Sequence, residues 1–229
     1  MKLKVLATCL LVSLFSGVQA KTYEYKTVKG DLMHTRIYTL DNGLKVYLSV
    51  NKEKPRIQTF IAVRTGSRND PAETTGLAHY LEHLMFKGTT HFGTSDLAKE
   101  TPYLDEITRR YEKYRLLTDS VQRRKAYHEI DSISQLAARY NIPNEYDKLM
   151  TSIGSEGTNA FTSTDVTCYV EDIPSNEVDN WAKIQAERFR NMVIRGFHTE
   201  LEAVYQEYNM GLASDARTVI DTLRSMLFF

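Results

Sequence analysis

The sequence predicts an α+β or mixed α/β layered fold, and three observations indicate it. Residues 37–63 contain three short β-rich runs, and a second β-rich stretch spans residues 158–170. Between these stretches lie a short apolar helix pattern and a long charged segment with helical spacing, residues 97–150. Two further helix patterns follow residue 175. An order of strands, helix, helical insert, strands and helices is typical of a sheet layer packed against helices.

Length and composition are those of one globular domain. The chain has 229 residues, which is enough for one large α/β domain with a well-buried core. Its 29 basic residues balance its 29 acidic residues, so the charge does not indicate a nucleic-acid face. We therefore expect a peptide or protein partner and no nucleic acid.

Residues 1–20 have the pattern of a signal peptide. Lys2 and Lys4 precede an apolar run at residues 5–15, and small residues follow where signal peptidase cuts. An uncleaved membrane anchor is the alternative, but the run is short for a span of about 20 residues. We expect a mature chain of residues 21–229 that is exported, periplasmic or secreted, with no stable membrane span.

The first β-rich runs predict a hairpin and a third strand. Residues 21–32 are polar and predict an irregular lead-in. Two strand patterns, residues 37–40 and 44–50, flank Asp41-Asn42-Gly43, and an Asn-Gly pair between such runs is typical of a hairpin turn. An alternating run at residues 57–63 predicts another strand before the first helix.

The charged segment at residues 97–150 predicts a long helical hairpin. Its apolar and tyrosine residues recur at helical spacing amid dense charge. Pro102 marks one helix start, and Asp119-Ser120 marks a second. We expect the charged faces to be solvated rather than to recognise a partner, and His128 to be a surface residue rather than a metal ligand.

Residues 158–170 predict either two strands or one bent strand, because bend-forming residues interrupt the β pattern. Cys168 lies in this stretch and would be the only cysteine of the mature chain. An internal disulfide is therefore excluded for the mature chain, and Cys168 is expected to pack as a small apolar residue in a strand.

Two helices are predicted in the C-terminal part of the chain. Ser175 is expected to cap a helix that runs to Met192 and buries Trp181 as a core residue. Thr199, followed three residues later by Glu202, predicts a capping box that opens a long final helix.

The short apolar helix, Gly76–Phe86, carries the residues that indicate chemistry. His79 and His83 are one helical turn apart, so their imidazoles can bind a single metal ion. Glu82 lies beside them, where a carboxylate can take a proton from a metal-activated water. The order His-x-x-Glu-His is the inverzincin signature. A purely structural amphipathic helix would explain the leucines of this segment but not two His and a Glu on one turn.

A catalytic zinc site of this type needs a third protein ligand, usually a carboxylate. Glu200 and Glu207 are seven residues apart, which is two helical turns, so both lie on one side of the final helix. One of them could bind the metal while the other orients a histidine ring. The alternative is a pair of ordinary surface glutamates on a helix that also carries Glu202.

Three ordered motifs together resemble the insulinase and pitrilysin family of zinc peptidases, the M16 family. They are His79–His83, Gly157–Ser163 and Glu200–Glu207. The resemblance extends from about residue 37 to the C-terminus. It implies an M16-like domain, in which helices cover one face of a layered sheet, and Zn²⁺ as the cofactor.

The resemblance gives each catalytic residue a role. It implies that His79, His83 and Glu207 bind Zn²⁺. Glu82 would be the general base that activates the water, and Glu200 would be the second acidic residue of the catalytic site, outside the ligand set.

Asn159 and Ala160 would lie on an edge strand with which the substrate backbone pairs, and such a strand favours extended peptides. The predicted function is a zinc metalloendopeptidase that hydrolyses peptides or unfolded proteins by metal-activated water. The alternative is an inactive or partner-dependent fragment that binds zinc and peptide without turnover.

Two features depart from the family pattern. The spacing from His83 to Glu207 is wider than usual, and an insertion at about residues 97–150 with adjacent ends accounts for the excess. Family members pair homologous α/β domains, and residues 21–229 cover roughly the first of them, the N-terminal metallopeptidase domain. The chain stops on apolar residues, 226–229, so we expect a truncated chain that needs a second M16-like half or a partner chain.

Overall fold

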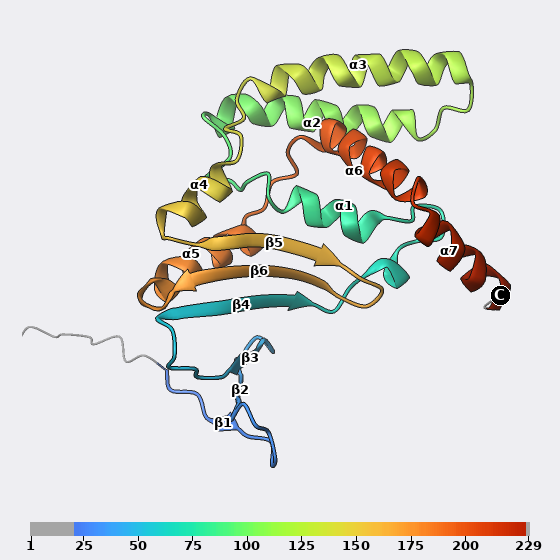
Figure 1. Ribbon diagram of the computed structural model, residues 1–229. Helices are drawn as coiled ribbons and strands as arrows, with labels where there is room; N and C mark the ends of the chain where they lie inside the picture. The colour runs from blue at the N-terminus through green and yellow to red at the C-terminus, as the bar shows by residue number, and fades with distance from the viewer. Residues whose placement is uncertain (1–20, 228–229) are drawn as a thin grey trace, which may run out of the picture. The chain divides into compact units, whose positions relative to one another are not determined.

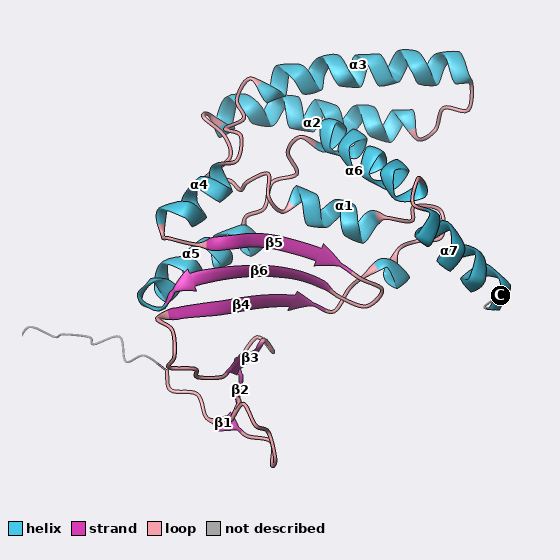
Figure 2. Cartoon of the chain, in the orientation of Figure 1, coloured by secondary structure: helices cyan, strands magenta, loops and turns pink. Residues whose placement is uncertain are grey.

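The computed structural model describes residues 21–227, and the predicted signal peptide lies outside them. The chain divides into two compact units, Met1–Lys54 and Pro55–Phe229, which are described separately below. Figures 1 and 2 show the helices and strands of each unit.

The N-terminal unit is a three-stranded antiparallel sheet in the order β1-β2-β3. β2 (Arg36–Thr39) and β3 (Lys45–Leu48) form the predicted hairpin. The prediction of an irregular lead-in was wrong in part, because β1 (Tyr25–Lys26) pairs with β2. The rings of Tyr25 and Tyr38 lie opposite each other with 5.5 Å between their centroids, a cross-strand contact that stabilises the pair. A strand of two residues is too short to show an alternating pattern.

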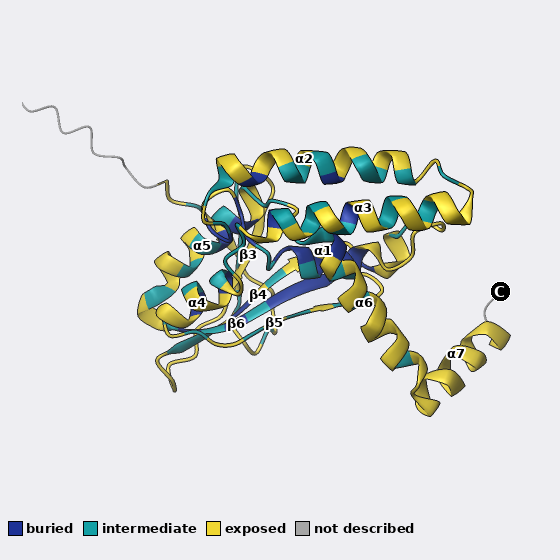
Figure 3. Ribbon diagram, turned by 90° about the horizontal axis from the view of Figure 1, so that it is seen from above, coloured by how far each residue is buried: buried dark blue, intermediate teal, exposed yellow. Residues whose placement is uncertain are grey.

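The second unit is built on a three-stranded antiparallel sheet in the order β4-β6-β5. β4 (Arg56–Val63) is the predicted third strand, and it belongs to this sheet rather than to the N-terminal hairpin. β5 (Glu156–Thr162) and β6 (Thr167–Pro174) are separate strands, so the bent-strand alternative is excluded. β6 lies in the centre and is largely buried (Figure 3), whereas β5 is an edge strand.

Cys168 lies in β6, where it is buried and free, as the sequence predicted. Burial raises the pKa of its thiol, which suits a packing role rather than a reactive one.

No helix within residues 21–227 is both long enough and apolar enough to cross a membrane.

Three helices pack on one face of this sheet: α1 (Leu77–Leu84), α4 (Glu145–Ser152) and α5 (Val178–Arg190) (Figure 1). Burial of apolar side chains between helices and sheet drives this packing. The core at this interface is formed by Phe92, Tyr146, Met150 and Ile173. The predicted α+β fold with helices on one face of a layered sheet is confirmed.

The bounds of α5 differ from the sequence prediction. Ser175 is not its cap, because Ser175–Glu177 form a separate 3₁₀ turn before the helix. Met192 lies beyond the helix and pairs instead with Thr89 in an isolated β-bridge. Trp181 packs against the core and is half-buried, as expected. A local 3₁₀ turn therefore precedes α5, and pairing of Met192 with Thr89 follows its end.

The predicted helical hairpin is confirmed: α2 (Leu97–Tyr114) and α3 (Ser120–Ala138) pack against each other (Figure 1). Asp119 caps α3 as predicted, since its carboxylate accepts a backbone amide hydrogen bond at 2.8 Å. Pro102 does not start α2. Asp96 caps that helix with a hydrogen bond of 3.1 Å. The helix therefore begins earlier in the chain than predicted, and Pro102 lies inside it.

The segment up to Met150 also contains a third helix, α4, which the sequence pattern did not separate from the hairpin. α4 follows Asn144, a non-glycine residue with a φ of 56°, and a left-handed residue redirects the chain. Tyr146 and Met150 of α4 lie in the core of the sheet layer. The hairpin itself therefore ends at Ala138, and α4 belongs to the helices that cover the sheet.

The predicted final helix is two helices, α6 (Phe197–Leu212) and α7 (Asp215–Leu227). The predicted capping box was wrong, because Thr199 lies inside α6. Gly196 precedes the helix with a φ of 65°, a conformation that glycine adopts without strain, and its carbonyl accepts the Glu200 amide at 2.9 Å. α7 is exposed along its length (Figure 3).

Candidate metal centre

A glycine and an aspartate determine where α1 begins. Gly76 has a φ of 94° and has no side chain that could cap the helix. The Asp70 carboxylate acts as the cap, because it accepts the amides of Gly76 at 2.7 Å and Ala78 at 2.9 Å. Its negative charge also interacts favourably with the positive end of the helix dipole. α1 therefore starts at a defined position beside the sheet.

His79 and His83 project from the same face of α1, as their spacing predicted. Their Nε2 atoms lie 3.2 Å apart, and the two rings are nearly perpendicular at 85°. The side chains are 35% and 26% exposed, respectively, so solvent reaches the point where the two nitrogens meet. This arrangement leaves room for one shared ligand at an accessible position.

Glu207 on α6 supplies a third ligand atom to the same point. Its Oε2 lies 3.5 Å from His83 Nε2 and 3.8 Å from His79 Nε2. Two tetrahedral ligands bonded to zinc at about 2.0–2.1 Å are about 3.3 Å apart, which is close to these separations. Two imidazoles and one carboxylate are also a donor set of open zinc sites. The residues present therefore fit a zinc ion.

Glu200 lies behind His83 rather than among the ligand atoms. His83 Nδ1 is 3.0 Å from Glu200 Oε1, and because an ionised carboxylate only accepts, the Nδ1–H donates. In the neutral imidazole, His83 Nε2 then carries no proton, and this is the form that binds a metal. The other oxygen of Glu200 pairs with Lys87 Nζ at 2.5 Å. Glu200 thus orients the His83 ring.

The charges of this group reinforce one another. The hydrogen bond with Glu200 raises the pKa of His83. Burial works to raise the pKa of Glu200, but its hydrogen bonds with His83 and Lys87 outweigh burial and hold this pKa below its usual value. Glu200 is therefore an anion at neutral pH when it supports His83.

Glu82 is buried beside the ligand group, with 6% of the residue exposed. Thr162 of β5 donates its hydroxyl to Glu82 Oε2 at 2.6 Å. A short hydrogen bond to a charged acceptor is among the stronger ones and holds the carboxylate in one orientation. Sequence reasoning missed Thr162. The available signal was its position two residues after Ala160, on the same face of the strand.

Asn159 and Ala160 lie on β5, opposite Val170 and Tyr169 of β6. Asn159 is exposed and Ala160 is half-buried. Among the described residues β5 has a strand neighbour on one side only, and the Ala160 amide donates to Asn159 Oδ1 at 2.9 Å. The structure places both residues on an edge strand that contacts α1, not among the ligand atoms.

Two other supporting residues were not found from the sequence. Lys87 lies four residues after His83, so its position near the same face of the helical segment was an available signal. Asp70 is separated from α1 by a loop, and no periodic pattern connects it with the helix that it caps.

Comparison with known proteins shows that part of this chain is similar to peptidases. Residues 45–103 match the family model described as Insulinase (Peptidase family M16). A stretch of 62 residues is 34% identical to the "Uncharacterized zinc protease YmxG" of Bacillus subtilis, and it covers 27% of this chain and 15% of that protein. A stretch of 55 residues is 44% identical to the probable mitochondrial-processing peptidase subunit beta of Arabidopsis thaliana, covering 24% of this chain and 10% of that protein.

A solved structure resembles the chain over a longer range. Pitrilysin matches it with a TM-score of 0.53 at 17% sequence identity, over 85% of this chain and 16% of the pitrilysin chain. At that identity the likeness shows the fold alone. Residues 45–103 therefore resemble the M16 peptidase family, and the fold of the chain resembles that of pitrilysin. The matches span 10–16% of the length of these three proteins.

Proposed function

We propose that this protein is a zinc-dependent metalloendopeptidase of the M16 type. The observation that carries the proposal is the meeting of His79, His83 and Glu207 at one solvent-accessible point, with Glu82 buried beside it. The names of zinc protease relatives support zinc as the metal. A surface cluster of acidic residues alone would not explain why a third carboxylate, Glu200, orients one of the histidines.

Each residue has a defined task in this proposal. His79, His83 and Glu207 hold the metal, and Zn²⁺ bound there would activate a water and polarise a peptide carbonyl. Glu82 accepts a proton from the water on its carboxylate and passes that proton to the leaving amine. Glu200 keeps the His83 ring in its ligand orientation.

The substrate is proposed to be an extended peptide or an unfolded protein. The free edge of β5 contains Asn159 and Ala160, and it leads to Thr162, whose hydroxyl contacts Glu82. A peptide added to this edge by backbone hydrogen bonds would pass beside the proposed metal site. Pairing of this kind needs an extended backbone, so folded substrates are disfavoured.

A partner is proposed as well. The chain spans 10–15% of the curated relatives it matches first. One of those relatives, in Homo sapiens, is named mitochondrial-processing peptidase subunit alpha, and it is 38% identical over 73 residues. In this chain, α7 exposes Val219, Ile220 and Leu223 by 48–57%, an apolar face that a second M16-like half or a partner chain would cover. The signal-peptide pattern supports a periplasmic or secreted location.

The alternative function is zinc and peptide binding without turnover, by a chain that is inactive or depends on a partner. The presence of Glu82 beside the three candidate ligands favours an enzyme. Under this alternative the purified protein binds zinc and extended peptide but hydrolyses neither peptides nor unfolded protein.

The test measures bound zinc and hydrolysis of fluorescently labelled casein in the purified protein. We expect one zinc per chain, and loss or strong weakening of zinc binding in Glu207→Ala. Gln206→Ala is the matched control, because this exposed neighbour on α6 lies outside the ligand group. Absence of zinc from the parent protein would contradict the metal site. Zinc binding without hydrolysis would favour the alternative function.

A further inference from the structure

The α2–α3 hairpin is connected to the rest of the second unit by two chain segments that lie side by side. Thr94 and Asn141 form an isolated antiparallel bridge, and the Ser95 amide donates to the Tyr140 carbonyl at 2.8 Å. The hairpin also has its own core around Ile107, Ile130 and Ala137. Its ends therefore meet, and its helices pack on each other, so its position depends on the few residues that contact other helices.

Those contacts converge on the first turn of α6 and on Arg195 just before it, whose guanidinium pairs with Glu100 of α2 at 2.6 Å and 2.9 Å. His198 is 3% exposed, and its ring lies between two hairpin residues: Tyr111 of α2, 2.8 Å from Nδ1, and Asp131 of α3, 3.6 Å from Nε2. Because the Asp131 carboxylate only accepts, the proton of a neutral imidazole belongs on Nε2, and the Tyr111 hydroxyl donates to Nδ1. The Tyr127 hydroxyl donates to Glu202 at 3.2 Å.

A row of aromatic rings extends this contact to α1. Phe197, the first residue of α6, lies between Tyr111 and Tyr80, with ring centroids 5.0 Å and 5.1 Å away. Tyr80 also donates its hydroxyl to the Phe197 carbonyl. Since Tyr80 lies next to His79 in α1, the hairpin packs at the joint between the two helices that hold the ligand atoms.

These contacts and the buried pair of Arg195 with Glu100 of α2 hold the start of α6. Its N-cap is Gly196, which has no side chain to accept a hydrogen bond, and a left-handed glycine gives the chain conformational freedom at that point. Glu200 lies two residues after His198 and must stay within hydrogen-bond distance of His83. A small rotation of the first turn of α6 would break that bond.

We propose that the α2–α3 hairpin is a clamp that positions α6 for metal binding, and that Tyr111, His198 and Asp131 are its positioning residues. The inference rests on the function proposed above, because it concerns the same metal site. The clamp acts through Glu200: Tyr111 and Asp131 fix His198, His198 fixes the first turn of α6, and that turn holds Glu200 against His83. The hairpin is thus part of the site although it supplies no ligand atom.

The test uses Tyr111→Phe in the purified protein, a variant that keeps the ring packed on Phe197 and removes the hydroxyl from His198. Loss of a residue that directly orients a metal ligand typically weakens metal binding about 10- to 100-fold. Tyr111 acts one contact further away, so we expect a rise in the zinc dissociation constant of about threefold to tenfold. The measurement is competition with a chromophoric chelator. Asp131→Asn should give the same direction.

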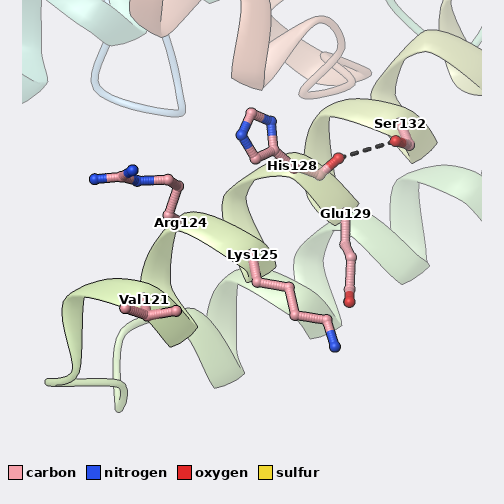
Figure 4. A pocket seen from close by; sticks show the side chains of 6 residues that line it. All are labelled: Val121, Arg124, Lys125, His128, Glu129 and Ser132. Carbon is pink, nitrogen blue, oxygen red and sulfur yellow. Dashed lines mark hydrogen bonds between the residues drawn. The ribbon is translucent and has the colours of Figure 1, made fainter.

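The control variants alter the hairpin away from the clamp. Arg124 and Lys125 project from α3 beside an open hollow of about 450 Å³ that Val121 and His128 also line (Figure 4). Arg124→Ala and Lys125→Ala should leave zinc affinity unchanged. Zinc affinity lowered equally by these variants would overturn the clamp, because a general loosening of the hairpin would then explain the effect.

A double-mutant cycle separates positioning from plain stability. In a Glu200→Gln background, Tyr111→Phe should weaken zinc binding no further, because the residue through which it acts has been changed. A purely structural role instead predicts a lower urea midpoint and an unchanged zinc affinity of the folded protein. The effects of the two substitutions on the free energy of unfolding would then be additive. If the parent protein binds no zinc, the proposed function fails. If the parent binds zinc normally and Tyr111→Phe does too, the clamp alone is wrong.

Discussion

Two glutamates of the second unit, Glu171 and Glu207, lie in opposite environments. Glu171 on β6 is fully buried, and both of its oxygens accept hydrogen bonds. The donors are the Tyr146 hydroxyl, Trp181 Nε1 at 2.9 Å, Gln185 Nε2 at 3.2 Å and Thr59 Oγ1 at 3.3 Å. In the metal centre, Glu207 is 51% exposed and its Oε2 faces two histidine nitrogens. A saturated carboxylate stabilises a core, whereas an accessible one can bind a metal or a proton.

Arg188 supplies the countercharge of Glu171. Its buried guanidinium lies 3.9 Å from Glu171. It is also 4.5–5.4 Å from four ring centroids, those of Phe86, Tyr146, Tyr169 and Phe189. Its three nitrogens have no hydrogen-bond partner among the described residues, so contacts with aromatic faces replace hydrogen bonds around this cation. The charge of Glu171 is therefore balanced internally and out of reach of any ligand.

The largest effect is expected for Glu82→Gln, which removes the proton acceptor of the metal centre. Casein hydrolysis should fall by roughly 100- to 10,000-fold, the usual contribution of a general base. Zinc content and the urea midpoint should stay unchanged, because Glu82 is not a ligand and glutamine fills the same volume. Hydrolysis that survives this change would remove Glu82 from its proposed role.

The next effect should appear in stability rather than in chemistry. Glu171→Gln leaves the buried Arg188 without a countercharge, and breaking a buried pair in this way costs about 3–5 kcal/mol of unfolding free energy. Urea denaturation followed by circular dichroism measures the loss. Asp172→Asn on the same strand, whose partly exposed carboxylate bonds Arg56, is the matched control and should cost much less. An equal loss of unfolding free energy in the two variants would contradict the contrast between a buried, fully hydrogen-bonded carboxylate and an exposed one.

Glu200→Gln should weaken zinc binding by about 10- to 100-fold, because it removes the charged acceptor that orients His83. Chelator competition measures the change, and the secondary structure should stay intact. Lys87→Met tests the outer contact of Glu200 and should have a smaller effect in the same direction. Unchanged affinity in Glu200→Gln would mean that the ring of His83 is held by its packing alone.

The smallest effect is expected for Thr162→Val, which removes the hydroxyl that holds Glu82. The rate constant kcat should fall about tenfold, which corresponds to ~1.5 kcal/mol for a hydrogen bond to a charged group. Thr162→Ser keeps the hydroxyl and should restore most of the rate, while KM changes little in both variants. A rate loss that serine does not restore would point to packing of the methyl group instead.

The sequence predicted those parts of the site that depend on spacing within one element. His79 and His83 are one turn apart on α1, and Glu200 and Glu207 are two turns apart on α6, so helix geometry alone placed each pair on one face. The assignment of Glu207 rather than Glu200 to the ligand group came from the resemblance to a family. In the structure Glu207 faces both Nε2 atoms, whereas Glu200 faces Nδ1 of His83.

Local patterns failed where a distant residue competed with them. Thr199 looked like a helix cap, but α6 starts earlier, where His198 is buried against the hairpin. Pro102 looked like a helix start, but Asp96 caps the helix first. The segment around α4 looked like the end of the hairpin, but burial of Tyr146 against the sheet made it a separate helix. In each case packing or capping outweighed a local preference worth a fraction of a kcal/mol to about 1 kcal/mol.

By itself, the sequence determined the type of fold, most strands and helices of the second unit, and which candidate residues share one face of a helix. Only the tertiary structure showed that Thr162 holds Glu82 across 80 positions and that Glu200 meets His83 across 117. It also showed that the hairpin contacts the first turn of α6. The physical reason is range: periodicity reports contacts within a helix or strand, whereas contacts between elements depend on how their buried faces pack.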